Sequence, residues 1–257
     1  MTATDDASNT SSAASWKIIV DSIAPTVPAI TLINDDVGSI TGNVANNGVT
    51  NDKTPTFSGT GEPGSLVTLY DNGLQMMVIL IDRPGTWSHS VPANEALSEG
   101  THRFTLTATD AAGNVVTAPP VIITVDTKAP DAPIISSATD DVGSLQSDLA
   151  NGGRSDDTLP LLKGTGVADS TITIYDGATP IGTATVTPEG SWSFQVTQPL
   201  SEGPHALSAI ATDKAGNASS AGNFTLTIDT TPPAAPVITS AEGLIGSETK
   251  LLAHGGS

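Results

Sequence analysis

Residues 101–114 read Thr-His-Arg-Phe-Thr-Leu-Thr-Ala-Thr-Asp-Ala-Ala-Gly-Asn, a pattern that indicates the architecture of the whole chain. In its first half, Phe104, Leu106 and Ala108 alternate with Arg or Thr. Successive side chains of a β-strand point to opposite faces, so this alternation predicts a strand with one buried face. The second half, from Asp110 to Asn114, consists of residues that favour turns. The stretch therefore predicts a β-strand that ends in a tight loop.

The same stretch recurs, because Ala108–Asn114 is matched by Ala211–Asn217 at an offset of 103 residues. Other segments recur in the same order: Asp35–Ser39 as Asp140–Ser144, Gly85–Ser88 as Gly190–Ser193, and Leu97–Gly100 as Leu200–Gly203. Repetition at a fixed period is the signature of a repeat architecture. We expect two whole repeats, at residues 21–126 and 127–229. Residues 1–20 are expected to be the C-terminal remnant of a preceding repeat, and residues 230–257 the truncated start of a further repeat with a non-repeat tail. The chain is thus expected to be an excerpt of a longer array.

Each repeat contains short runs rich in β-branched residues, separated by turn residues. In the first repeat these runs predict strands at residues 28–33, 55–60, 65–70, 76–82, 86–91, 102–109 and 119–125. Seven strands in about 100 residues is the count of an immunoglobulin-like sandwich. The predicted fold class is all-β, with tandem immunoglobulin-like β-sandwiches in a linear array.

The composition excludes several classes of partner and site. Lys and Arg total 9 and Asp and Glu total 27 among 257 residues, which gives a formal net charge of −18. Nucleic acids and anionic membranes are themselves negative, so neither is an expected partner. The chain has no Cys, which excludes disulfides and thiolate metal sites. No apolar run reaches the roughly 18 residues of a membrane helix, so no membrane insertion is expected. The N-terminus lacks the pattern of a standard signal peptide.

The sequence gives no support to catalysis. It contains no Gly-x-Ser-x-Gly, no His-Glu-x-x-His and no phosphate-binding loop. His102 and His205 align within the motif Glu-Gly-x-His, and we expect each to be held by its preceding turn. We therefore predict that the protein is not an enzyme; a glycosidase with two acidic residues is the enzymatic alternative.

Taken together, the repeated motifs resemble the tandem bacterial Ig-like repeats of giant type I-secreted surface adhesins, the biofilm-associated protein family. The resemblance covers roughly residues 1–241 and rests on the Asp-Asp-Val-Gly loop, Asn51–Thr56, the Gly-x-Trp-Ser strand and the Ala-Thr-Asp-x-Ala-Gly-Asn loop. It implies a protein secreted to the bacterial cell surface that supports adhesion or biofilm formation. The implied partners are neighbouring repeats and a host or biofilm surface, and calcium is implied at the joints between domains.

The acidic residues suit this implied calcium site. Calcium prefers six to eight oxygen ligands, and a sandwich places its loops at two poles. Stacked head to tail, Asp35, Asp36 and Asp126 are expected to meet Asp213 at one joint. The predicted metal ligands of all joints are Asp21, Asp35, Asp36, Asp52, Asp110, Asp126, Asp140, Asp141, Asp213 and Asp229. The alternative is that these Asp residues only form loops, because Asp hydrogen-bonds its own backbone.

Two functional hypotheses remain open from the sequence. The first is a structural spacer, a monomer made rigid by calcium. The second is a module whose loops bind a receptor or a glycan directly. Trp87 and Trp192 occupy equivalent positions and bear on this choice. We expect both to be core residues, and the alternative is an exposed platform that stacks on sugars.

Overall fold

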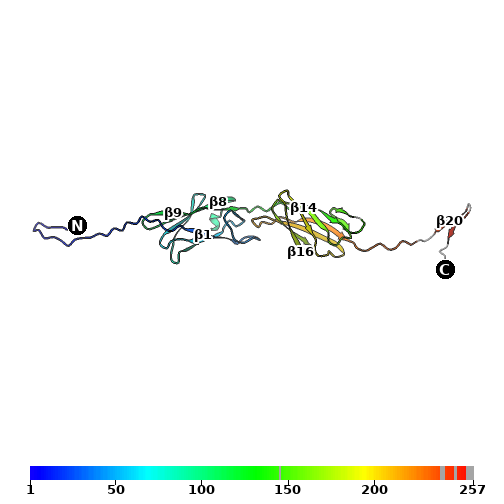
Figure 1. Cartoon of the computed structure of the whole chain (residues 1–257), viewed down its shortest axis with the longest axis horizontal. Coiled ribbons are helices and arrows are strands. Elements are labelled where there is room, and N and C mark those ends of the chain that lie inside the picture. Colours follow the sequence, from blue (N-terminus) through cyan, green and yellow to red (C-terminus); the bar gives the residue numbers. More distant parts are fainter. Residues whose placement is uncertain (145, 238–240, 246–247, 253–257) are drawn as a thin grey trace.

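The computed structural model describes residues 1–144, 146–237, 241–245 and 248–252. Two β-sandwiches lie end to end along the long axis, and the N-terminal segment leaves the first sandwich at its outer pole (Figure 1). A two-stranded hairpin, β20 (Ala241–Ile245) with β21 (Glu248–Leu252), follows the second sandwich. Within the described ranges, no helix is long and apolar enough to cross a membrane.

The first sandwich consists of two facing sheets. One has the order β2-β1-β4-β7, with β1 Ala29–Asp35, β2 Gly42–Asn43, β4 Thr56–Thr60 and β7 Thr86–Ser90. The other has the order β3-β10-β8-β5-β6, with β3 Gly48–Thr50, β5 Leu66–Asp71, β6 Leu74–Leu80, β8 Gly100–Thr109 and β10 Val121–Val125. A short strand, β9 (Val115–Thr117), pairs with β8 off this path. All pairs are antiparallel except β3 with β10, which run parallel.

The second sandwich repeats this topology. Its smaller sheet has the order β12-β11-β14-β17, with β11 Ile134–Asp140, β12 Ser147–Leu149, β14 Leu161–Thr165 and β17 Ser191–Gln195. Its larger sheet has the order β13-β19-β18-β15-β16, with β13 Gly153–Ser155, β15 Thr171–Asp176, β16 Thr179–Thr185, β18 Gly203–Thr212 and β19 Gly222–Ile228. The parallel pair of this sandwich is β13 with β19.

All-β architecture and tandem Ig-like sandwiches are confirmed. Each of the seven strands predicted in the first repeat exists, although β2, β3 and β9 were not predicted. These three strands have only two or three residues, too few to show the alternation that identifies a strand in a sequence. The opening stretch forms β8, where Phe104, Leu106 and Ala108 are at most 1% exposed.

The predicted core position of both tryptophans is confirmed, because Trp87 and Trp192 are each 4% exposed. Each indole lies against a glycine of the neighbouring strand, Gly59 or Gly164, where a Cβ atom would collide with the ring. Each indole Nε1 also donates a 3.1 Å hydrogen bond to a backbone carbonyl, that of Thr60 or Thr165. Neither ring is therefore accessible as a platform for sugars.

Candidate functional site

The joint between the sandwiches is formed by the loop Asp213–Asn217 of the second one. Ser39 Oγ, in the first sandwich, donates a 3.0 Å hydrogen bond to Gly216 O. Asn217 Nδ2 donates one of 2.8 Å to Asp126 O. Ala215 is only 1% exposed, whereas its counterpart in the first sandwich, Ala112, is exposed. The loop is thus packed against the pole of the preceding sandwich.

The carboxylate of Asp213 holds this loop in shape. Its Oδ1 accepts 2.9 Å hydrogen bonds from the backbone N–H groups of Ala215 and Asn217. Its Oδ2 accepts a 2.9 Å bond from Asn217 Nδ2. These hydrogen bonds hold the loop without a metal ion, as expected if Asp213 serves only to form the loop. A cation could bind only through the lone pairs of the carboxylate that these bonds do not use.

The same loop is built at two other places. Asp110 accepts hydrogen bonds from Ala112 and from Asn114, and Asp5 accepts the equivalent bonds from Ala7 and Asn9. The side-chain amide of Asn114 lowers the pKa of Asp110 below its ordinary value. The motif is a local structure that folds the same way in each copy.

The joint contact also recurs upstream of the first sandwich. Asn114 Nδ2 donates to Asp21 O at 3.2 Å and to Ile23 O at 3.3 Å, as Asn217 does to Asp126 O. The structure thus brings the backbone of Asp21 to the Asp110 loop. The Asp21 carboxylate accepts a 3.1 Å bond from the N–H of Ile23 and so shapes the incoming linker.

A cavity of about 230 Å³ lies at the joint, with three carboxylate residues in its wall. Its lining residues are Asp126, Lys128, Ala129, Pro130, Asp131, Val167 and Asp213. The structure therefore brings together Asp126 and Asp213, two of the four residues expected to meet at this joint. Asp131 was missed, although its position three residues before β11, the first strand of the second sandwich, could have indicated it. Asp35 and Asp36 do not line this cavity.

Asp35 and Asp52 instead form a buried network inside the first sandwich, where they are 5% and 1% exposed. Thr50 Oγ1 donates a 2.5 Å hydrogen bond to Asp35 Oδ2 and accepts one of 3.0 Å from Asp52 N. Asp52 Oδ1 accepts a 2.7 Å bond from Thr54 N. Asp52 Oδ2 is buried and has no hydrogen-bond partner within the described part of the chain. A buried carboxylate oxygen without a donor is destabilising unless a cation or water satisfies it.

The second sandwich contains the same network and the same unpartnered oxygen. Ser155 Oγ donates a 2.7 Å bond to Asp140 Oδ2 and accepts one from Asp157 N at 3.0 Å. Asp157 Oδ2 is buried and, among the described residues, unpartnered. Asp157 was not among the predicted ligands, although its alignment with Asp52 could have identified it.

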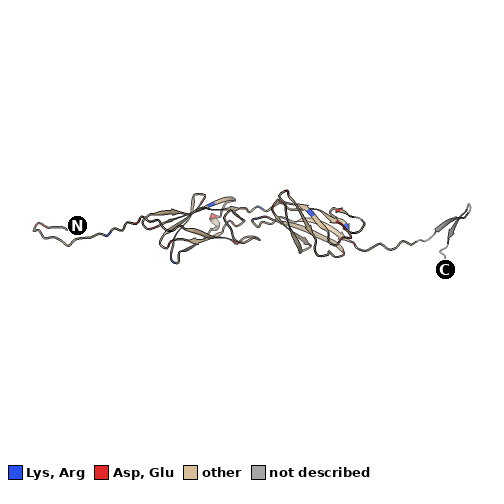
Figure 2. Cartoon of the chain, in the orientation of Figure 1, with Lys and Arg blue, Asp and Glu red and all other residues tan. Residues whose placement is uncertain are grey.

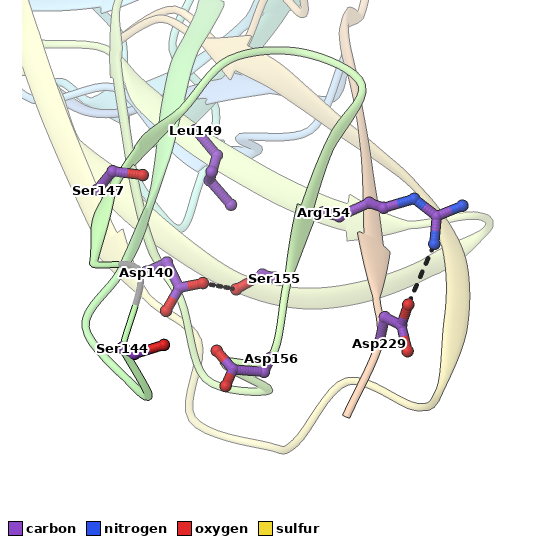
Figure 3. A pocket seen from close by; sticks show the side chains of 8 residues that line it. All are labelled: Asp140, Ser144, Ser147, Leu149, Arg154, Ser155, Asp156 and Asp229. Atoms are coloured by element: carbon purple, nitrogen blue, oxygen red, sulfur yellow. Dashed lines mark hydrogen bonds and ion pairs between the residues drawn. The ribbon is translucent and has the colours of Figure 1, made fainter. Parts of the chain in front are cut away.

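A pocket of about 420 Å³ opens beside this network at the C-terminal pole of the second sandwich (Figure 3). Its lining residues are Asp140, Ser144, Ser147, Leu149, Arg154, Ser155, Asp156 and Asp229. Two predicted ligands, Asp140 and Asp229, thus share one pocket, and Asp156 joins them. The Arg154 guanidinium lies 3.2 Å from Asp229 Oδ2 and partly neutralises this carboxylate. Asp36 and Asp141 are exposed and line neither of these two cavities.

The donor chemistry of these cavities fits calcium. The acids of the chain lie mostly in loops and at strand ends (Figure 2), and carboxylate, hydroxyl and carbonyl oxygens are the ligands that calcium prefers. The unpartnered oxygens of Asp52 and Asp157 are consistent with a cation at the C-terminal pole of each sandwich. Within the described residues, however, no three His, Cys, Asp or Glu side chains are close enough together to hold a metal ion.

Each sandwich also contains, near its C-terminal pole, a buried histidine paired with a partly exposed aspartate. His102 Nδ1 lies 2.7 Å from Asp71 Oδ2 and its Nε2 lies 2.9 Å from Ser98 O. His205 lies 2.7 Å from Asp176 Oδ2 and 2.8 Å from Ser201 O. The contact with the preceding turn confirms the expectation for both histidines. The carboxylate partners were missed.

The turn that precedes β8 also holds the linker between the sandwiches. Thr127 donates two hydrogen bonds to the Glu99 carboxylate, from its N–H at 2.7 Å and from its Oγ1 at 2.9 Å. The backbone N–H of Thr127 makes the largest contribution to a lowered pKa of Glu99. Glu202 binds Thr230 after the second sandwich in the same way.

Comparison with known families agrees with this geometry. The family model described as bacterial Ig-like domain matches residues 26–127 and 129–230, which correspond to the two sandwiches. The chain belongs to the bacterial Ig-like domain family. A search of curated proteins found no match.

Several solved structures are similar to this tandem of Ig-like domains. One is a Ca²⁺-stabilized adhesin with which an Antarctic bacterium binds ice, at 23% identity and a TM-score of 0.42, covering 94% of this chain and 57% of that one. The BSP domain of a biofilm-associated protein has 23% identity and a TM-score of 0.29, with 73% and 29% covered. The fibronectin(III)-like modules of Clostridium thermocellum CbhA have 16% identity and a TM-score of 0.42, with 76% and 92% covered. This chain thus spans less than two thirds of either adhesin chain.

Proposed function

We propose that this chain is a spacer segment of a secreted adhesin at the bacterial cell surface, where it supports adhesion or biofilm formation. The observation that carries the proposal is the joint, in which the Asp213–Asn217 loop packs on the preceding sandwich and bonds to Asp126 O. The same contact between Asn114 and Asp21 supports repetition along an array. A module of this kind acts by its length and stiffness and performs no catalysis.

Calcium stiffens the joints in this proposal. Asp126, Asp131 and Asp213 line the joint cavity, and Asp140, Asp156 and Asp229 line the pocket at the C-terminal pole of the second sandwich. Each set would hold an ion once its carboxylates move closer together than they lie in this structure. When bound, calcium supplies positive charge that offsets the repulsion between these carboxylates. The protein supplies the loop geometry that presents their oxygens to one cavity.

Calcium titration of the whole chain tests the proposal. A ligand that binds only the folded form stabilises it by mass action, and extracellular modules bind calcium at roughly 10⁻⁴–10⁻³ M. Millimolar calcium should raise the melting temperature and narrow the distribution of end-to-end lengths measured by X-ray scattering. A chelator that changes neither quantity would show that calcium has no role in the joint.

Substitutions locate the ion. Asp126→Ala and Asp213→Ala should each weaken calcium binding at the joint, and the double variant should add little, because groups in one network are non-additive. Asp110→Ala is the matched control, since it removes the same loop carboxylate as Asp213→Ala from a loop that lines no part of the joint cavity. Asp229→Ala should leave binding at the joint intact. Equal losses in Asp110→Ala and Asp213→Ala would assign the effect to the loop fold and contradict a shared ion.

A further inference from the structure

Strand β6 is the outermost strand of its sheet and carries exposed apolar side chains. The sheet order ends at β6, so the backbone groups on one side of this strand have no strand partner within the described chain. Leu74, Val78 and Leu80 are 76%, 49% and 55% exposed. Leu66 of the neighbouring strand β5 pairs with Leu80 and is 44% exposed. It extends the apolar surface from the edge toward the middle of the sheet. Leu66, Val78 and Leu80 share one face of the sheet, and we call these three residues the β6 face; Leu74, which pairs with Asp71, lies at the same edge on the opposite face.

The second sandwich has a threonine at every corresponding position. By register, Leu66, Leu74, Val78 and Leu80 correspond to Thr171, Thr179, Thr183 and Thr185. Its edge strand, β16, also contains Pro180, which has no N–H to donate. Natural proteins protect edge strands with proline and polar residues of this kind. The edge strand β16 of the second sandwich is therefore protected, whereas β6 of the first sandwich is not, although both sandwiches share the same fold.

The charge pattern favours a second copy of this chain as the partner of the β6 face. Residues 72–81 read Asn-Gly-Leu-Gln-Met-Met-Val-Ile-Leu-Ile and contain no charged residue, in a chain of net charge −18. Two such chains repel each other over most of their surface, and this uncharged strand is where close approach costs least. An edge strand offers unpaired N–H and C=O groups that another β-strand can satisfy.

We propose that β6 of the first sandwich pairs with β6 of a second copy. A two-fold axis makes such a contact isologous, and the two strands then run antiparallel and join the two larger sheets into one. The β6 faces of both copies come together beside the new ladder and remove apolar surface from water. This inference goes beyond the spacer role and does not depend on calcium, and it replaces the expectation of a monomer.

A single contact of this kind is weak. The strand has seven residues, whereas a stable interface has roughly 20–30 residues on each side. Association of isolated chains should therefore need a high protein concentration. The strands run from pole to pole, so antiparallel pairing of β6 with β6 would link arrays that run in opposite directions. Arrays that meet from two facing surfaces would form one such contact for each repeat with an unprotected edge, and multivalency strengthens binding without any new contact.

Sedimentation velocity over a dilution series tests the proposal. The wild-type chain should show a weight-average sedimentation coefficient that rises with concentration, together with slower hydrogen exchange in β6. The triple variant Leu74→Thr/Val78→Thr/Leu80→Thr carries the residues of the second sandwich, so it should fold normally and lose the concentration dependence. The control Ile134→Thr/Leu159→Thr removes exposed apolar side chains (61% and 39% exposed) from the second sandwich and should associate like the wild type.

Several outcomes would overturn the proposal. A wild-type chain that is still monomeric at about 1 mM, the scale of the weakest specific affinities, does not use this edge for self-association. Association that persists in the triple variant, or that is lost equally in the control, places the contact elsewhere. A monomer that binds an apolar peptide through the β6 face would assign this surface to a foreign partner.

Discussion

His102 and His205 each place both ring nitrogens next to an acceptor, a carboxylate on one side and a backbone carbonyl on the other. Only the doubly protonated imidazolium can donate to both acceptors at once. The two residues are 2% and 7% exposed, so water does not readily replace a lost donor. For His205, this arrangement links the stability of the second sandwich to pH.

The second sandwich should lose stability as the pH rises. Burial opposes protonation of His205, but hydrogen bonds to Ser201 O and Asp176 outweigh it and raise the pKa above the ordinary value of 6.5. A group with a raised folded-state pKa stabilises fully below its unfolded pKa, here about 6.5, and this contribution disappears as the pH rises through the folded value. The denaturant midpoint for unfolding of the second sandwich should therefore fall as the pH is raised from mildly acidic to mildly alkaline.

The variant His205→Gln provides the control for this pH dependence. Glutamine keeps an amide donor and does not titrate. The denaturant midpoint for unfolding of the second sandwich should therefore no longer depend on pH over the same range. A wild-type midpoint that rises with pH would contradict the assigned hydrogen bonds.

At the residue scale the sequence predicted hydrophobic positions better than polar partners. The burial of Trp87 and Trp192 follows from strand alternation alone. The pairing of His102 with Asp71 does not, because the two residues are 31 positions apart and meet only when β8 lies beside β5. The inward orientation of Asp52 was likewise invisible, since it depends on a turn formed after β3. The sequence signal that could have identified the histidine partners is the Asp shared by both repeats before a hairpin turn, Asp71 and Asp176.

At the scale of elements, the loop before β8 connects the core of the first sandwich to its linker. His102 binds Ser98 O, and the adjacent Glu99 accepts both hydrogen bonds from Thr127. Since Thr127 begins the linker, this short loop restricts the direction in which the chain leaves the sandwich.

Glu99→Ala should therefore broaden the range of orientations between the two sandwiches. Thr127 loses both acceptors, while the rest of the linker is unchanged. Small-angle scattering or residual dipolar couplings should report the broader distribution. Because the Thr127 N–H lowers the pKa of Glu99, the wild-type restraint should be fully present above the ordinary pKa of 4.5. It should be lost as the pH falls through the lower pKa of the folded state.

Glu202→Ala is the matched control for Glu99→Ala. Glu202 binds Thr230, beyond the second sandwich, so its removal should leave the orientation of the two sandwiches unchanged. An equal effect of both substitutions, or no effect of Glu99→Ala, would rule out the role of this loop.

Elements of ordinary length were predictable, while the short ones were not. Seven strands of the first repeat follow from their alternation. The three-residue β3, in contrast, exists because the distant β10 provides its partner: Val49 pairs with Thr124, 75 residues later in the sequence. A further unpredicted feature is a compensating exchange in the core. Met77 and His89 of the first sandwich correspond to Gly182 and Phe194 of the second, where the phenyl ring lies against the glycine.

At the scale of the whole molecule, one rule places each sandwich on the next. Asn217, in a loop at one pole of the second sandwich, donates to the backbone carbonyl of Asp126 at the end of the first, and Asn114 donates in the same way to Asp21 before the first sandwich. Equivalent contacts give equivalent orientations, so repeats added by this rule extend in one direction. The extended arrangement of the two sandwiches in Figure 1 is the shortest example of such an array.

The parallel pairing of β3 with β10 has a mechanical consequence. When the two ends of a sandwich are pulled apart, β1 and β2 lie between the pulled end and β3 and must leave first. The start of β3 is then drawn toward one pole and the end of β10 toward the other. Parallel strands then slide along each other, and the ladder at Gly48, Val49 and Thr50 is loaded in shear, so its bonds must break together. Stretching single molecules should give two abrupt force peaks, one per sandwich, whereas smooth extension at low force would indicate peeling. A filament of such units would transmit traction from a distant anchor without lengthening.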